Sequence, residues 1–383
     1  MIRSTVADVD LDAIEHNTRA VRRRAGVDVI AVVKADGYGH GAEAVAGAAI
    51  EGGASSLAVA TVEEAVVLRR ARPRDPLLVL LGAQEQAERD AAVALDLAVT
   101  VWDVDAARAM GEAARAARRT AALHFKVDTG LTRLGAPLAE APERYRAIAA
   151  LPGVRIDGVF THLARADEID LATTTQQLDR FDAFLGAIDR PRWVHASASG
   201  GVASLPARPH VTAVRVGLAI YGLHAAPHLA DRLDLRPALS WRSRVHRVAD
   251  VREGTGVSYG HEYRLPRDGR IATVPVGYGD GLPRAARPAS LLVHGTPVRI
   301  AGRVAMDHVM LDVTGLGDVR VGDEVVVIGT QGGARRSAED LAADSGTINY
   351  EVVIAIKPRV PRRYLRGGAL VATKTLAEGY LPC

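Results

Sequence analysis

The chain has 383 residues, of which 48% are hydrophobic and 24% charged, and its formal net charge is +3. This composition is typical of a globular protein and excludes a disordered, collagen-like or disulfide-rich chain. Aromatic residues are only 4%, which argues against a nucleic-acid-binding surface. No apolar run approaches the roughly 20 residues of a membrane span, and the N-terminus lacks the apolar stretch of a signal peptide, so we expect a cytoplasmic protein with no membrane contact.

Short apolar runs alternate with alanine-rich segments of helical spacing over the first part of the chain. Eight such runs occur, at residues 29–34, 56–61, 76–82, 97–103, 121–128, 154–162, 192–197 and 211–217. Strands that are buried on both faces read as continuous apolar runs. The pattern predicts an α/β fold, an N-terminal (β/α)8 TIM-type barrel over residues 1–235. A doubly wound open sheet is the alternative, and the count of eight favours the barrel.

From about residue 236 the pattern changes to short alternating runs separated by Gly, Pro and Asp. This predicts a C-terminal β-rich domain over residues 236–383. Within it, the segment from Ser337 to Asp340 has the pattern of a capping box and predicts the start of a helix.

Lysine is scarce in this chain. Of the 48 basic residues only four are lysines, namely Lys34, Lys126, Lys357 and Lys374, and the other 44 are arginines. A lysine amine can lose its proton and act as a nucleophile, whereas a guanidinium cannot. Positions that keep lysine are therefore candidates for a catalytic amine that acts as a nucleophile.

Two of the four lysines lie at the ends of apolar runs, Lys34 in IAVVK and Lys126 in LHFKVDTG. The active site of a TIM-type barrel is built at these C-terminal strand ends, and burial there lowers a lysine pKa. The glycine-rich segment after Lys34, ADGYGHG, is neither a P-loop nor a dinucleotide-binding motif. The single cysteine is Cys383, so a cysteine-based zinc site is excluded, and we expect no metal.

The segment VVKADGYGHG resembles the pyridoxal-phosphate lysine motif of the alanine racemase family. The resemblance continues in family order through DLDAIEHN, KVDTGLTRLG, THLARADE, VRVGLAIYG, GVSYGHEY, GYGDGLPR, GRVAMDHVMLDV, TINYEV and RVPRRY. Ten motifs in order, spanning both expected domains, indicate membership of this family.

The resemblance implies a two-base racemase that interconverts L- and D-alanine with pyridoxal 5′-phosphate as cofactor. Lys34 would hold the cofactor covalently and act as one acid/base. Tyr259 of GVSYG would be the opposing acid/base, supplied by the other subunit of a homodimer. The D-alanine would serve peptidoglycan synthesis.

Further roles follow from the same resemblance. Arg215 would face the pyridine nitrogen and, because it keeps its proton, would leave that nitrogen unprotonated. His162 would position Arg215 and Tyr259. Lys126 would be the lysine that many relatives carry as a carbamate, paired with Arg133, which would contact the phenolic oxygen of the cofactor and the substrate.

Cofactor phosphate and substrate would be held by residues from both domains. The phosphate would be bound by hydroxyl groups and strand-end amides, from Tyr38, Ser199, Gly217, Leu218 and Tyr350. From the partner subunit, Met306 and Asp307 would line the end of the site that receives the substrate carboxylate, and Tyr278 would narrow the access to it. Arg284 resembles a residue that supports these groups.

This chain departs from the usual family pattern at Asp36, Ala198, Gly279 and Ala305. Ala198 replaces an asparagine and Ala305 replaces a frequent cysteine, which leaves a broad-specificity or serine racemase as an alternative to an alanine-specific enzyme. The architecture also resembles that of related decarboxylases, which place an acid opposite the pyridine nitrogen. This chain has Arg215 at that position, which argues against a decarboxylase. A non-catalytic cofactor carrier of the single-barrel kind would need neither the second domain nor Tyr259.

Overall fold

Eight parallel strands close into a barrel in the computed structural model, which describes residues 3–72 and 74–383. The strands are β2 (Asp28–Val32), β3 (Ser56–Val59), β4 (Leu77–Val79), β5 (Ala98–Val101), β6 (Ala121–Asp128), β8 (Val154–Phe160), β9 (Trp193–His195) and β10 (Ala213–Val216). Each pairs in parallel with the next, and β10 pairs with β2 to complete the ring. Each of the eight predicted runs overlaps one of these strands, so the barrel prediction is confirmed.

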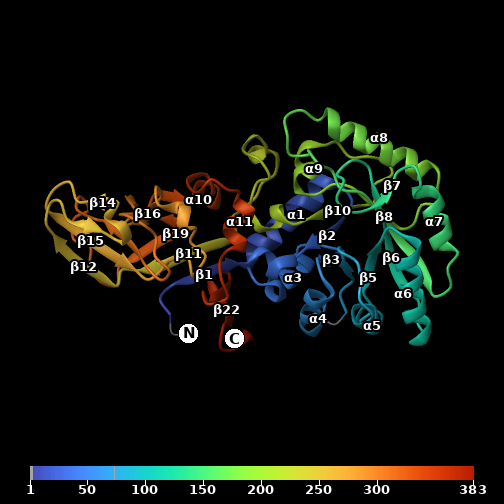
Figure 1. Cartoon of the computed structure of the whole chain (residues 1–383), viewed down its shortest axis with the longest axis horizontal. Coiled ribbons are helices and arrows are strands. Elements are labelled where there is room, and N and C mark those ends of the chain that lie inside the picture. The colour runs from blue at the N-terminus through green and yellow to red at the C-terminus, as the bar shows by residue number, and fades with distance from the viewer. Residues whose placement is uncertain (1–2, 73) are drawn as a thin grey trace. The chain divides into compact units, whose positions relative to one another are not determined.

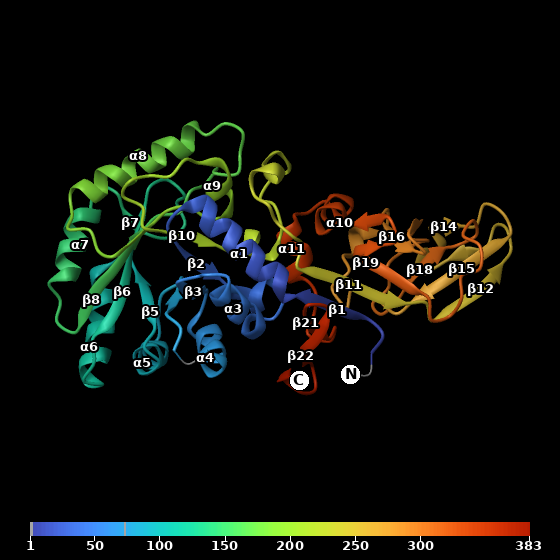
Figure 2. The same cartoon turned by 180° about the vertical axis from the view of Figure 1, so that it is seen from behind.

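Helices lie around the outside of the barrel strands (Figures 1 and 2). They are α1 (Leu11–Ala25), α3 (Ala42–Glu51), α4 (Val62–Ala71), α5 (Gln86–Ala94), α6 (Val104–Ala116), α7 (Ala141–Ala149), α8 (Ala172–Gly186) and α9 (Ser199–Ser204). Local signals start several of them: Thr61 and Glu64 form a capping box on α4, and Asp103 caps α6. The short strand β7 (Ala136–Pro137) pairs with β6, and the 3-10 turns η1 (Leu218–Tyr221) and η2 (Pro227–Arg232) follow β10.

A cluster of aromatic rings anchors helices α7 and α8 to the barrel. Phe125 of β6 lies 5.9 Å from Phe184 of α8 and 5.7 Å from Tyr145 of α7, between ring centroids. Tyr145 also donates a hydrogen bond to the carbonyl of Asp189. Aromatic pairs at these separations bury much apolar area and restrict the orientation of the helices that carry them.

A second compact unit is rich in β structure, as predicted. Its main sheet has the order β17-β16-β19-β11-β1-β21-β22-β23, with β20 paired to β19. These strands are β1 (Val6–Asp10), β11 (Leu239–Arg244), β16 (Ser290–Val293), β17 (Thr296–Arg299), β19 (Glu324–Gln331), β20 (Ala334–Arg336), β21 (Arg362–Arg366), β22 (Ala369–Thr375) and β23 (Gly379–Pro382). A three-stranded sheet is made of β12 (Arg247–Val251), β15 (Gly269–Val274) and β18 (Val309–Asp312), and a hairpin of β13 (Gly256–Val257) and β14 (Tyr263–Arg264).

Few helices interrupt this β-rich unit. They are α10 (Ala338–Ser345), α11 (Asn349–Ile354) and the 3-10 turns η3 (Tyr259–His261) and η4 (Arg284–Ala286). The predicted capping box is present at the start of α10, where Ser337 and Asp340 each accept a hydrogen bond from the other's backbone N–H.

The two units divide between Arg236 and Pro237, but two earlier segments group with the β-rich unit: the chain up to Asp12, and Tyr38–Ala44. The first does so because β1 pairs antiparallel with β11 and parallel with β21. The sequence-based division into residues 1–235 and 236–383 did not assign these two early segments to the β-rich unit, because a change in composition along the chain carries no information about strand pairing. Among the described residues, every helix is too short or too polar to span a lipid bilayer.

Candidate active site

Lys34 begins a turn of unusual backbone geometry immediately after β2. Ala35, Asp36 and Gly37 all adopt left-handed conformations, with φ of 52°, 52° and 62°. A left-handed conformation costs an ordinary L-residue about 1–2 kcal/mol, and such strain is concentrated at functional sites. The turn is held by Glu64, whose carboxylate accepts a hydrogen bond of 2.7 Å from the backbone N–H of Ala35. The backbone that directly follows Lys34 is therefore held in a strained conformation.

The Lys34 amine lies among other positive charges. Burial lowers its pKa below the usual range, and the guanidinium groups of Arg133 and Arg215 lower it further, while Glu64 opposes them. Both burial and nearby cations favour the neutral form of an amine. A neutral lysine amine is a nucleophile.

Lys126, near the end of β6, is 5% exposed and has its amine 5.6 Å from the ring centroid of Phe160. Burial, together with Arg215 and Arg133, lowers the pKa of Lys126 to about 8, against the opposing charge of Asp128. Both lysines selected from the sequence thus have lowered pKa values, for the same physical reasons.

Arg215 is buried at the end of β10 and bonded on two sides. Its Nη1 donates to His195 Nδ1 at 2.7 Å, and its Nη2 donates to His162 Nδ1 at 3.0 Å and to the carbonyl of Thr161 at 2.9 Å. The guanidinium carbon lies 4.7 Å from the centroid of the Phe160 ring. Although burial lowers the pKa of Arg215 to about 9, the side chain stays cationic at neutral pH.

These hydrogen bonds fix the proton positions on three histidines. A guanidinium has only donors, so His195 and His162 must accept through Nδ1 and, being neutral, carry their proton on Nε2. His195 Nε2 then donates to His124 Nδ1 at 2.9 Å. Burial, with the charge of Arg215, lowers the pKa of His124 and of His162 to about 3 and that of His195 well below its ordinary value. The three rings stay neutral beside the arginine.

Three residues predicted to hold phosphate lie together after β9 and β10. Ser199 is the first residue of α9, and its hydroxyl accepts a hydrogen bond of 3.1 Å from the backbone N–H of Ala219. Ala219 lies in η1, which begins at Leu218 directly after Gly217, and all of these residues are buried. Ala198 is the extended residue that precedes α9.

The remaining predicted residues belong to the β-rich unit. Tyr38 is buried and lies 6.3 Å from Tyr350 of α11, between ring centroids, and burial together with Tyr350 raises the pKa of the Tyr38 hydroxyl. Tyr38 is followed by Gly39, where φ is +78° and an added Cβ would come within 2.2 Å of the Val353 carbonyl oxygen. Only glycine fits this close approach.

Tyr259, Tyr278 and Met306 are exposed on loops of the same unit, at 70%, 39% and 52% of their surface. The loops contact one another: the backbone N–H of Tyr278 donates to the Ala305 carbonyl at 3.1 Å, and Ser258 Oγ donates to the Arg303 carbonyl at 2.7 Å. Large exposed side chains grouped in this way are typical of surfaces that meet a partner.

The structure thus brings Lys34, Lys126, Arg133, His162 and Arg215 within electrostatic reach of one another in the barrel unit. In the β-rich unit it brings Tyr38 to Tyr350, and Tyr278 to the loop that carries Met306 and Asp307. Among the described residues, no group of three or more His, Cys, Asp or Glu side chains could hold a metal ion.

Comparison with known proteins identifies the family. The model of the alanine racemase N-terminal domain matches residues 9–225, and that of the alanine racemase C-terminal domain matches residues 238–364. The chain belongs to the alanine racemase family. It is 44% identical over 369 residues to the alanine racemase of Symbiobacterium thermophilum, a match that covers 95% of this chain and 97% of that one.

Solved structures of alanine racemases share the fold over nearly the whole chain. The structure from Bacillus anthracis with bound L-Ala-P superposes with a TM-score of 0.91 at 35% identity and covers 98% of this chain and 99% of that one. The structure from D-cycloserine-producing Streptomyces lavendulae gives a TM-score of 0.89 at 38% identity, with coverage of 96% and 98%. The family assignment made from ten motifs is confirmed.

Several residues of this alanine racemase family member were missed by sequence reasoning. His195 lies in the apolar run 192–197, and His124 lies two residues before Lys126 in the same strand. The argument that titratable groups in buried strands have shifted pKa values could therefore have selected both histidines. Glutamate is common near the start of a helix, where it forms part of a cap, so the position of Glu64 gives no sign of a further role. Its second contact, with the turn after Lys34, depends on the tertiary structure.

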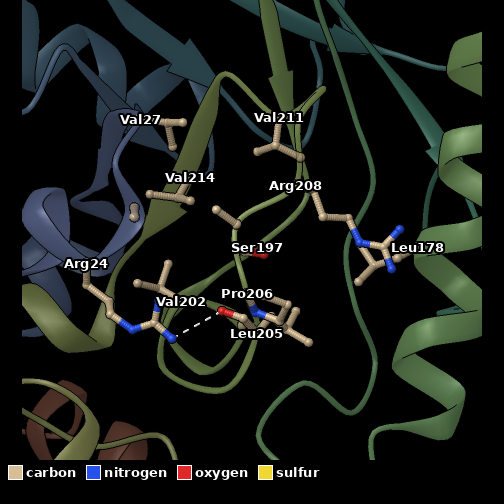
Figure 3. Close-up of a pocket in the computed structure, with 13 residues that line it drawn as sticks. Arg24, Val27, Leu178, Ser197, Val202, Leu205, Pro206, Arg208, Val211 and Val214 are labelled. Atoms are coloured by element: carbon tan, nitrogen blue, oxygen red, sulfur yellow. Dashed lines mark hydrogen bonds between the residues drawn. The ribbon is translucent and has the colours of Figure 1, made fainter.

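A separate hollow lies between the end of α1, helices α8 and α9, and strand β10 (Figure 3). It is lined mainly by apolar side chains such as Val27, Val202 and Val214, and at one side Arg24 donates a hydrogen bond of 3.2 Å to the Leu205 carbonyl. None of the predicted site residues lines it.

Proposed function

We propose that this protein is an alanine racemase that interconverts L- and D-alanine with pyridoxal 5′-phosphate, and that it works as a homodimer with shared active sites. The observation that carries the proposal is the strand-end lysine, Lys34, whose pKa is lowered by burial and by the charges of Arg133 and the buried Arg215, in a chain of this family. The D-alanine would supply peptidoglycan synthesis in the cytoplasm.

The charges of the barrel unit fit an anionic cofactor. Lys34 and Lys126 lie within electrostatic reach of Arg133 and Arg215, so four basic side chains share this part of the barrel unit. The carboxylates that act on the two lysines are Glu64 and Asp128, which raise their pKa values. Such an excess of positive charge in a half-buried site favours binding of a phosphate dianion. When bound, the cofactor withdraws the electron pair left at the substrate Cα when a proton is removed.

Individual roles follow the chemistry of each group. Lys34 would hold the cofactor through its amine and Arg215 would face the pyridine nitrogen, with Arg133 at the phenolic oxygen. The phosphate would be bound by hydroxyl groups and backbone amides, namely those of Tyr38, Ser199, Gly217, Leu218 and Tyr350.

Two bases on opposite faces of Cα account for inversion. Lys34 would move the proton on one face and Tyr259 on the other, so that a proton removed from one side is replaced on the other. Because a guanidinium keeps its proton, Arg215 would leave the pyridine nitrogen unprotonated, which would restrain side reactions. His162 accepts a hydrogen bond from Arg215 at 3.0 Å and would position it and Tyr259.

A partner subunit would complete the site. Tyr259, Tyr278 and Met306 are exposed, which suits residues that reach into the site of a second copy, together with Asp307.

The carbamate on Lys126 is likewise a proposal, supported by burial of an amine whose pKa is about 8.

A broad-specificity or serine racemase is the second candidate, because Ala305 and Ala198 are smaller than the residues common in the family. Incubation of the purified protein and pyridoxal phosphate with L-alanine, L-serine or L-lysine, followed by chiral chromatography, tests both. We expect D-alanine to form fastest. Comparable rates on the three substrates would replace alanine specificity with the broader activity, and no inversion of any of them would overturn racemisation in favour of a non-catalytic carrier.

A further inference from the structure

We propose that Arg359 and Asp280 are positioning residues that fix the two loops presenting Tyr278 and Met306. The inference rests on the proposed function, in which these exposed side chains reach the partner subunit's active site. The two loops are residues 275–283, between β15 and η4, and residues 301–308, before β18.

The two loops are joined first by their backbones. The N–H of Tyr278 donates to the Ala305 carbonyl at 3.1 Å, and the N–H of Gly279 donates to the Met306 carbonyl at 2.8 Å. At Gly277 an added Cβ would lie 2.3 Å from the Ala305 oxygen and 2.4 Å from the Met306 oxygen. The approach is therefore possible only with glycine at this position, and the two loops form one surface.

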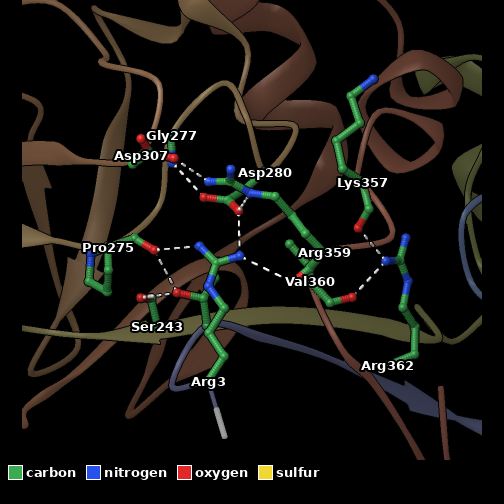
Figure 4. A network of polar contacts seen from close by, with 11 residues as sticks. Arg3, Ser243, Pro275, Gly277, Asp280, Asp307, Lys357, Arg359, Val360 and Arg362 are labelled. Atoms are coloured by element: carbon green, nitrogen blue, oxygen red, sulfur yellow. Dashed lines mark hydrogen bonds and ion pairs between the residues drawn. The ribbon is translucent and has the colours of Figure 1, made fainter. Parts of the chain in front are cut away.

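Beneath this surface lies a carboxylate with no exposure to solvent. Asp280 is 0% exposed and accepts hydrogen bonds from Arg3 Nη1 at 2.5 Å, from Arg359 Nε at 2.6 Å and from the Gly277 N–H at 3.0 Å (Figure 4). Burial alone would raise the pKa of Asp280, but the bonds to Arg3, Arg359 and Gly277 hold it below its ordinary value. A buried charge of this kind is tolerated only while its partners remain.

Arg359 extends the contact to the second loop. While its Nε donates to Asp280, its Nη2 donates to the exposed carboxylate of Asp307 at 2.6 Å. One planar guanidinium thus connects a carboxylate in each loop, and the fixed geometry of its donors fixes their separation. Arg3 supports the assembly by donating to the carbonyls of Pro275 and Arg359.

The side chains of Tyr278 and Met306 are exposed while the backbone that carries them is fixed from within. In the described structure the Asp307 carboxylate binds Arg359, so this network also fixes the loop that presents Met306. Removing the guanidinium would leave Asp280 with fewer partners and would release Asp307, so both loops would lose their fixed position.

Arg359→Gln tests the proposal, with Arg320→Gln as the matched control because Arg320 is an exposed arginine paired with the exposed Asp318. Hydrogen exchange followed by mass spectrometry would be measured on peptides covering the two loops. In Arg359→Gln we expect exchange there to be at least about tenfold faster than in the wild type, with the rest of the β-rich unit unchanged. In Arg320→Gln we expect wild-type exchange in both loops.

Kinetics provide the second measurement, and Arg359→Lys the conservative variant. We expect Arg359→Gln to raise KM for alanine about fivefold while kcat changes by less than about twofold, with partial recovery in Arg359→Lys. Unchanged exchange in the two loops, or equal acceleration throughout the β-rich unit, would overturn the positioning role. If the wild-type protein racemises nothing, the proposed function fails, but the exchange experiment still decides whether Arg359 fixes the loops.

Should Arg359→Gln fail to fold, Asp307→Ala removes the acceptor at one end of the connection and leaves the ion pair of Arg359 with Asp280 in place. Faster exchange confined to residues 301–308 is then the expected result. Wild-type exchange in that loop would overturn the proposal.

Discussion

Lys34 differs from the other lysines in its surroundings. Burial and two neighbouring arginines lower its pKa, whereas Lys357 is exposed and Lys374 forms an ion pair with Glu43 at 2.9 Å. The scarcity of lysine in the sequence pointed to four positions, and their place at the ends of apolar strands selected two of them. Their electrostatic neighbours could not be predicted, because these come from separate strands.

Lys34→Arg is expected to abolish both racemisation and the visible absorbance of cofactor bound through the lysine amine, since a guanidinium remains protonated and cannot act as the nucleophile. Absorbance spectra of the purified variant after addition of pyridoxal phosphate measure this directly. Lys357→Arg is the control and should retain both properties. Full activity with a normal spectrum in Lys34→Arg would remove Lys34 from its assigned role.

Lys126 should show a pH-dependent reaction with carbon dioxide. Its pKa is about 8, and only the neutral amine reacts, so the reactive fraction rises from about one tenth at pH 7 to about nine tenths at pH 9. Carbon-13 NMR of the protein in labelled bicarbonate should therefore show a carbamate signal that grows over this range. Lys126→Arg should lack the signal, and a signal of equal size in that variant would place the carbamate elsewhere.

At the scale of elements, the barrel strands could be predicted because burial on both faces leaves a continuous apolar run. The left-handed turn after Lys34 could not, because Ala35 and Asp36 are not residues that demand positive φ. Strand β1 was also missed, since its partners β11 and β21 lie far away in the sequence. The hydrogen-bonded series from Arg215 through His195 to His124 crosses three barrel strands and has no local signal.

Helix α6 offers a test of how backbone geometry sets stability. Arg118, just beyond its C-terminus, is exposed and has φ of 54°, a conformation that glycine adopts without a steric penalty. Arg118→Gly is expected to raise the free energy of unfolding by up to about 1 kcal/mol, whereas Arg115→Gly within the helix should lower it by about 1 kcal/mol. Denaturant titration of both variants measures the difference, and equal destabilisation would contradict the left-handed assignment.

At the scale of the whole molecule, the chain contributes Lys34 from one unit and exposes Tyr259 on the other. If each active site takes these residues from different subunits, two inactive variants should complement one another. Co-expressed Lys34→Arg and Tyr259→Phe chains are expected to recover about a quarter of wild-type activity, because about half of the dimers are mixed and each of these has one intact site.

The control for complementation is co-expression of Lys34→Arg with Lys34→Ala, which cannot rebuild a site in any pairing. Sedimentation analysis should show dimers in both mixtures. Dimers without recovered activity in the first mixture would mean that Lys34 and Tyr259 act within one chain.

Inversion at Cα depends on the two opposed bases, and the most direct test is the exchange of the Cα proton of alanine in D2O, followed by proton NMR. The wild-type protein should exchange L- and D-alanine with inversion. In Tyr259→Phe, exchange from L-alanine should fall by at least about a hundredfold, while D-alanine, whose proton is assigned to Lys34, should lose far less. Equal losses for the two isomers would contradict the assignment of one base to each face.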